Sequence, residues 1–138
     1  GRFNEISKTI KDAEKRLAEI AVLKTHIINY AKTRDVYVAY RKAGYSKRFL
    51  EEHREEIMLH QAAKQAFTEL KMEKLPRVKD LNEEYARVLE GKRAAYGEYR
   101  QAKKEMQDFL IAQKNVEAIL GEESKEQEKR KKKTVSLS

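Results

Sequence analysis

Histidine and carboxylate side chains at helical spacing are the groups of this chain that could bind a metal. His53, Glu56 and His60 are three and four residues apart, so a continuous helix places them on one face. Imidazole and carboxylate at this spacing supply metal ligands in helical bundles. A complete site needs further ligands from another helix, and no Glu-x-x-His pair occurs in the chain. We therefore expect no metal site and place these histidines at the surface or at the edge of the core.

Other signatures of catalysis are missing from the sequence. It contains no Gly-rich phosphate loop and no Gly-x-Ser-x-Gly elbow. Cysteine is absent, which removes disulfides and thiolate zinc sites. We expect no catalytic residue, no cofactor and no enzymatic activity in these 138 residues.

Basic residues are the remaining candidates for a binding function, because the formal net charge is +8. They cluster around two tyrosines in the first third of the chain and again near its end. The candidate nucleic-acid-binding residues are Lys32, Arg34, Arg41 and Lys42, and then Lys129, Arg130, Lys131, Lys132 and Lys133. Cations of this kind bind phosphates, and aromatic rings among them stack bases.

Each basic cluster also has a plainer interpretation. Tyr37 and Tyr40 can pack in the core while the cations around them extend into solvent, and for the first cluster we favour this interpretation. The second cluster can equally be an inert solubilising end of the chain. Both stay open at this point.

The elements that carry these residues are predicted to be long helices. Apolar side chains recur in alternating steps of four and three over some forty residues, which is the heptad pattern of a helix packed along a partner. Ten of its twelve positions are apolar, the exceptions being Lys92 and Gln113, and the positions are Leu81, Tyr85, Val88, Lys92, Ala95, Tyr99, Ala102, Met106, Phe109, Gln113, Val116 and Leu120. A similar stripe, from Ile6 through Ile20 to Ala31, predicts an earlier helix. The chain has only one proline and five glycines to interrupt such helices.

Turn residues divide the chain into three predicted helices. Gly44 is placed to end the first helix, and Ser46 to cap the second. Pro76 separates the second helix from the third, and no glycine or proline interrupts the second between Lys47 and Glu73. Short connections predict an all-α, up-down-up, elongated and coiled-coil-like bundle of three long helices with overhanging ends. A two-helix stalk with a small helical tip is the competing arrangement, and it requires a break in the second helix.

The predicted domain boundaries follow from turn residues of the same kind. Residues 1–121 are predicted to form one helical, coiled-coil-like domain, with Gly121 ending the third helix. Residues 122–138 form a charged tail that we expect to be disordered. No apolar run is long enough to cross a membrane and no signal peptide is visible, so we expect a cytoplasmic protein that does not insert into membranes. Because the chain begins at Gly1, we interpret it as a fragment of a longer protein.

Long stretches of the sequence resemble the C-terminal helical region of relaxase/mobilization nucleases from conjugative and mobilizable elements of Firmicutes. The resemblance runs from about Thr25 to Gly121. It is carried by THIINYAKTRDVYVAYRKAGYSKRFLEEHREEI, by KLPRVKDLNEEYARVLEGKRAAYGEYRQAKKEM and by KNVEAILG.

The resemblance implies a parent protein that nicks DNA and stays attached to it through a tyrosine. That chemistry belongs to the family's N-terminal nuclease domain, whose histidine cluster is not matched here, so neither a metal ligand nor a nucleophile is transferred to this chain. The resemblance predicts a non-catalytic accessory module that engages DNA or conjugative transfer proteins. We also expect self-association, or packing on a missing N-terminal part, because overhanging apolar stripes need cover. The alternative is a structural spacer or oligomerisation module with no nucleic-acid role.

Overall fold

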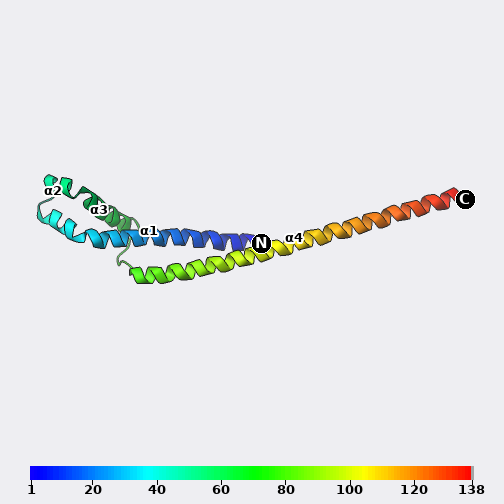
Figure 1. Cartoon of the computed structure of the whole chain (residues 1–138), viewed down its shortest axis with the longest axis horizontal. Helices are drawn as coiled ribbons and strands as arrows, with labels where there is room; N and C mark the ends of the chain where they lie inside the picture. Colours follow the sequence, from blue (N-terminus) through cyan, green and yellow to red (C-terminus); the bar gives the residue numbers. More distant parts are fainter. Residues whose placement is uncertain (138) are drawn as a thin grey trace.

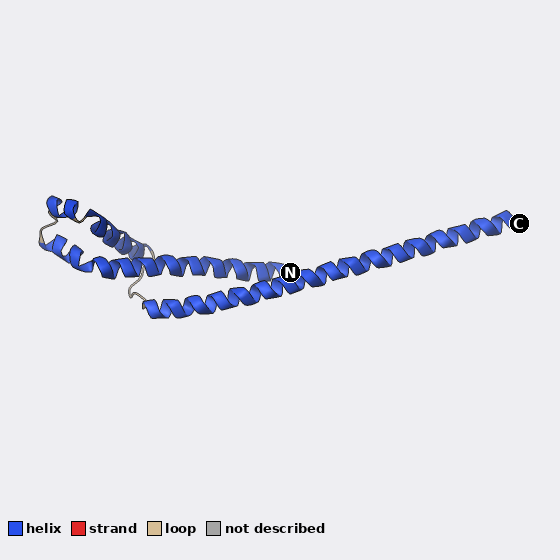
Figure 2. Cartoon of the chain, viewed as in Figure 1, coloured by secondary structure: helices blue, strands red, loops and turns tan. Residues whose placement is uncertain are grey.

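The computed structural model describes residues 1–137, with side chains through Thr134, and these residues form helices joined by short turns. The elements are α1 (Arg2–Lys42), α2 (Lys47–Glu52), α3 (Arg54–Glu69) and α4 (Val78–Leu137). Figure 1 shows an elongated molecule, and Figure 2 shows that only helices and connecting loops are drawn in the described part. The all-helical prediction is confirmed.

Helix α1 packs against two other helices of the chain, one along each half of its length. Its second half packs against α3 and its first half against the beginning of α4. Contacts from Arg2 to Glu105 and from Arg16 to Glu84 show that α1 and α4 are antiparallel. The predicted up-down-up bundle, with the first and last helices parallel, is therefore wrong. The competing stalk with a small helical tip describes this arrangement better (Figure 1).

The break that this arrangement requires lies at His53, whose backbone leaves the helical region at φ −126° and ψ 29°. Glutamates occur on both sides of it at i,i+4 spacing, as Glu51 with Glu55 and Glu52 with Glu56. Like charges at this spacing destabilise a continuous helix. After the break, Glu55 and Glu56 lie in the first turn of α3, where the helix dipole favours negative charge.

Helix α3 also ends earlier than predicted, at Glu69 rather than near Pro76. Lys71 adopts a left-handed conformation with φ 53°, and the amide of Met72 donates to the carbonyl of Phe67. This is a Schellman cap with lysine in the position that usually holds glycine. The cap turns the chain so that Met72 packs against the core.

The turn between α1 and α2 follows the prediction. Gly44 has φ +67°, and the amide of Tyr45 donates to the carbonyl of Tyr40, as in a Schellman cap. The hydroxyl of Ser46 accepts a hydrogen bond from the amide of Phe49 and caps α2.

Two small apolar clusters hold the helices together. One cluster joins α1, α3 and the start of α4, and the other joins the start of α1 to the middle of α4. Their buried members are Ile20, Leu23, Ala63, Phe67 and Leu81 in the first, and Ile6, Ile10, Ala95 and Ala102 in the second. Most of these positions belong to the predicted stripes. Tyr85, which the stripe also places in the core, is 39% exposed, although Leu81 before it and Ala95 after it are buried.

Helix α4 does not end at Gly121 but continues to Leu137, through most of the charged segment for which the sequence predicts disorder. Ser138 lies outside the described residues. A glycine inside a helix costs only about 1 kcal/mol. Beyond it, Glu126 precedes Arg130 and Glu128 precedes Lys132 at i,i+4 spacing, an order that stabilises helices. None of the described helices contains a stretch that is long and apolar enough to cross a membrane.

Candidate functional site

His60, the centre of the metal-site hypothesis, is buried in an aromatic stack. It is 3% exposed and lies between the rings of Tyr30 and Tyr37, with centroid distances of 4.6 and 4.3 Å. Its Nδ1 lies 2.9 Å from Oγ1 of Thr33, and that hydroxyl also contacts the carbonyl of Asn29 at 2.6 Å. The Thr33 hydroxyl donates to Asn29, and the direction of its hydrogen bond with His60 depends on the imidazole tautomer. The expectation of a surface or boundary position is wrong for His60.

The charge of this imidazole is disfavoured by its surroundings. Burial lowers the pKa of His60, and the nearby ammonium of Lys64 lowers it further, while a hydrogen bond to the backbone of Tyr30 opposes the shift. The neutral ring therefore belongs to the packed core.

The other two members of the proposed metal site lie apart from it. His53 is half-buried at the helix break, with its ring 4.4 Å from that of Phe49, and Glu56 is exposed on α3. Within residues 1–134, no three His, Cys, Asp or Glu side chains are grouped so that they could hold a metal ion. The break at His53 removes the shared helix face on which the hypothesis depended.

The first basic cluster lies on exposed positions of the second half of α1. Arg34 and Arg41 are seven residues apart and share a helix face, whereas Lys32 and Lys42 lie on other sides. The tyrosines between them pack inward, as the plainer interpretation predicted: Tyr40 is 8% exposed, and Tyr37 stacks on His60.

The second basic cluster lies at the far end of α4. Five consecutive residues of a helix are rotated by 100° each, so Lys129–Lys133 surround the helix rather than line one side of it. Figure 1 places this end and the first cluster at opposite extremities of the molecule. The structure therefore does not bring the two basic clusters together.

Between these ends, α4 extends past the start of α1 and carries an uncovered apolar face. We call residues 106–120 the overhang. Its exposed large apolar side chains are Met106, Phe109, Leu110, Ile111, Val116, Ile119 and Leu120, with exposed fractions between 49% and 67%. All of them except Ile111 lie on or beside the heptad stripe. The end of the third predicted helix therefore lacks cover within the described chain, as expected. The start of the first helix was also expected to overhang, and that expectation is wrong, because Ile6 and Ile10 are buried against Ala95 and Ala102 of α4.

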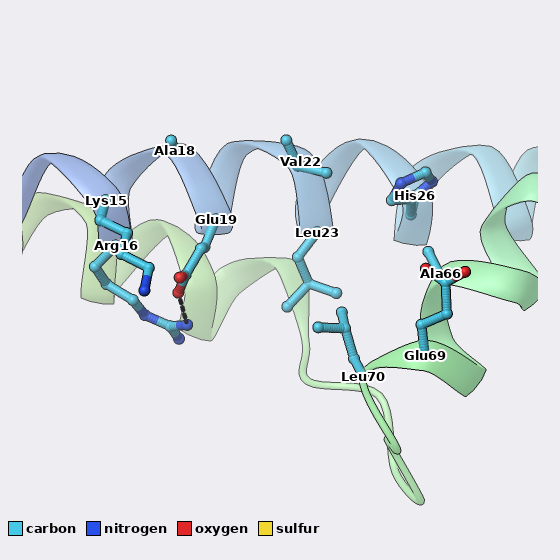
Figure 3. A pocket seen from close by; sticks show the side chains of 10 residues that line it. All are labelled: Lys15, Arg16, Ala18, Glu19, Val22, Leu23, His26, Ala66, Glu69 and Leu70. Carbon is cyan, nitrogen blue, oxygen red and sulfur yellow. Dashed lines mark hydrogen bonds and ion pairs between the residues drawn. The ribbon is translucent and has the colours of Figure 1, made fainter.

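An open groove of about 560 Å³ lies where α3 ends against α1, and the sequence did not predict it (Figure 3). Its walls are aliphatic, with Ala18, Val22 and Leu23 from α1 facing Ala66 and Leu70. Charged side chains surround the walls, and Arg16 pairs there with Glu19 at 3.4 Å. Val22 and Leu70, which are 58% and 59% exposed, are apolar residues that lack a partner helix.

Comparisons with family models, with curated proteins and with solved structures found no match to this chain. The resemblance to relaxases therefore stays a prediction, and the functional argument depends on the geometry.

Proposed function

We propose that this chain is a non-catalytic accessory module of a DNA-nicking relaxase, and that it engages DNA through the basic end of α4. The observation that carries the proposal is the position of Lys129–Lys133. These five cations surround a helix end that projects away from the packed part of the molecule (Figure 1). A polyanion can reach them from any side.

The electrostatics support this assignment. Five positive charges over five residues occupy only about 7 Å of helix axis. Such a density attracts the phosphates of nucleic acid and displaces their counterions, which gives affinity without sequence specificity. The exposed first cluster, Lys32, Arg34, Arg41 and Lys42, is a second contact at the other extremity.

Gel-shift titration against single- and double-stranded DNA tests the proposal. We expect binding at low salt that weakens steeply as salt is added, by orders of magnitude if six or more phosphates are neutralised. Replacing Lys129–Lys133 by glutamine should weaken binding at least tenfold and reduce the salt dependence. The control variant replaces five exposed cations elsewhere, namely Lys8, Lys11, Lys15, Lys103 and Lys104. An equal loss in the control, or no binding at low salt, contradicts the proposal.

The overhang favours a second candidate function, a structural oligomerisation module. Six large apolar side chains on or beside its stripe are about half to two thirds exposed, and a contiguous exposed apolar face of this kind marks a protein–protein interface. The stripe contains no charged residue between Met106 and Leu120, so two copies can face each other without like-charge conflict. We therefore propose a second copy of the chain as its occupant. From the resemblance to relaxases, we also propose conjugative transfer proteins as partners of this chain.

A further inference from the structure

Tyr45 is the most exposed of the seven tyrosines, although its backbone conformation is unfavourable for an aromatic residue. Its side chain is 56% exposed, and its φ is +59°. A left-handed backbone costs a residue with a Cβ atom about 1–2 kcal/mol, and glycine or asparagine occupies it more readily. Ring contact with Tyr40, at 5.3 Å and 87°, accounts for an apolar residue at this position. This contact does not explain why the ring of Tyr45 is largely exposed to solvent.

Two ordered elements hold this ring at the extremity of the molecule. The amide of Tyr45 is bonded to the carbonyl of Tyr40, and Ser46 caps α2 directly afterwards. Tyr40 in turn packs on Phe49 of α2 at 6.0 Å. The exposed ring therefore packs at its edge on Tyr40, which is itself packed on Phe49. The turn that carries it, between α1 and α2, lies at one end of the molecule (Figure 1).

Cations flank Tyr45 in the sequence, and acidic residues lie only at the borders of this stretch, at Asp35, Glu51 and Glu52. Residues 36–50 contain Arg41, Lys42, Lys47 and Arg48 but no aspartate or glutamate. All four cations are exposed, and only Arg48 forms an ion pair, with Glu52. Two of them, Arg41 and Lys42, also stabilise the C-terminal end of α1. Because Arg48 is paired with Glu52, the cations available to an external anion are Arg41, Lys42 and Lys47.

We infer that the tip between α1 and α2 binds single-stranded nucleic acid, with a base stacked on Tyr45 and phosphates held by Arg41, Lys42 and Lys47. An exposed ring among cations matches a strand whose bases are unpaired, because every base has a face that can stack. A duplex offers the phosphates but not the base. The inference rests on the proposed engagement of DNA, and it makes the contact at this extremity selective for single strands.

The absence of tryptophan from the chain allows a direct test. In the full chain carrying Tyr45→Trp, the only tryptophan reports on the tip. Titration with a short oligothymidylate at low salt should quench its fluorescence by half or more. Polyglutamate, which lacks bases, should not quench it, and duplex DNA should quench it weakly. The fluorescence of the matched reporter Tyr96→Trp, at a position 38% exposed in the part of α4 that packs against α1, should stay unchanged.

Affinity measurements separate stacking from charge. Tyr45→Phe should bind oligothymidylate as the parent chain does, whereas Tyr45→Asn should bind about tenfold more weakly. Asparagine tolerates the left-handed backbone, and helix content by circular dichroism confirms that the variant is folded. Equal quenching by duplex and single strand, or unchanged affinity of Tyr45→Asn, overturns the inference.

A further combination distinguishes the tip from the end of α4. In Tyr45→Trp with Lys129–Lys133 replaced by glutamine, quenching should persist at higher oligonucleotide concentration. If the parent chain binds DNA while the fluorescence of the Tyr45→Trp variant stays unchanged, the tip inference fails and the proposed function stands. If the tip is quenched and the glutamine replacement binds as tightly as the parent, the role of the α4 end fails and the inference stands. If no DNA binds at low salt, both fail.

Discussion

Arg16 of α1 and Glu84 of α4 form a bidentate ion pair. Nε of the guanidinium donates to Oε2 at 2.6 Å, and Nη2 donates to Oε1 at 2.8 Å. The hydrogen bond to Arg16 lowers the pKa of Glu84, and the same contact raises the pKa of Arg16. The pair also fixes the register of the two helices. A slip of one heptad would place Arg16 opposite Arg77 or Gly91 instead of Glu84 and leave Glu19 of its own helix as its ion-pair partner.

A double-mutant cycle with Arg16→Gln and Glu84→Gln should measure a coupling of about 1 kcal/mol in the free energy of unfolding. The value is modest because the two side chains are 41% and 30% exposed, which leaves them open to solvent screening. Urea unfolding of the four proteins measures it. The exposed pair Arg48 and Glu52 is the control and should give a smaller coupling.

Acid should remove this coupling. Because the pKa of Glu84 is lowered on folding, its contribution to stability is present above the ordinary glutamate pKa. The contribution is then lost as the pH falls through the lowered pKa of the folded state. Repeating the cycle at pH 7 and in strong acid checks the sign, and a coupling that is unchanged in acid contradicts this account.

His60 predicts a separate pH dependence at milder acidity. Its pKa is lowered on folding, so the unfolded chain takes up a proton more readily than the folded one. Stability should therefore be full above the ordinary histidine pKa and fall as the pH drops from about 7 to 5. In His60→Phe this fall should disappear, because the ring stack remains and Thr33 still donates to Asn29. Thermal unfolding at both pH values measures it.

The other histidines provide the comparison for that experiment. His53→Phe should keep the fall of the parent chain, because the His53 ring packs on Phe49 outside the buried stack. Equal stability of the parent chain at pH 7 and pH 5 would show that protonation of His60 is tolerated.

Local patterns predicted much of the fold. The stripe positions Ile6 and Ile20 are buried. As predicted, Gly44 lies in the turn that ends α1, and Ser46 caps the start of α2. These features depend on residues a few positions apart, so the sequence displays them directly.

The topology could not be predicted from the same patterns. The break at His53 and the left-handed Lys71 shorten the second helix, and neither involves glycine or proline. Because the second predicted helix is shortened, α3 covers only the second half of α1. Helix α4 runs antiparallel to α1 and covers its first half. The burial of His60 follows from this arrangement, because only the pairing of α1 with α3 brings Tyr30 and Tyr37 to its two faces.

The sequence predicted which types of residue form the candidate sites, but not where these residues lie in the structure. The sequence identifies Arg41 and Lys129 as members of basic clusters, yet their separation to opposite extremities depends on the antiparallel packing of α4 and on its continuation past Gly121 (Figure 1). Tyr45 was missed because an exposed tyrosine is distinguished from a buried one only by the turn that carries it.

Lys71→Gly should stabilise the chain by about 0.5–1 kcal/mol. Lysine at φ 53° has the steric cost of a left-handed residue, which glycine does not have, although glycine increases the entropy of the unfolded chain. Lys71→Ala is the matched control and should give no gain, because alanine keeps the Cβ atom. Chemical unfolding compares the two, and a gain of equal size in both would place the effect elsewhere.

Phe109→Glu should weaken self-association at least tenfold without unfolding the isolated chain. Phe109 is 67% exposed in the middle of the overhang, so a monomer loses little by its replacement. In a paired overhang the new carboxylate would be buried against apolar side chains, which is costly. Ile111→Glu is the control, because Ile111 is 59% exposed but lies off the stripe and should tolerate the charge. Sedimentation equilibrium of the parent chain and both variants measures the dimer constant. A parent chain that stays monomeric at high concentration, or equal weakening by both substitutions, would show that this face does not bind a second copy.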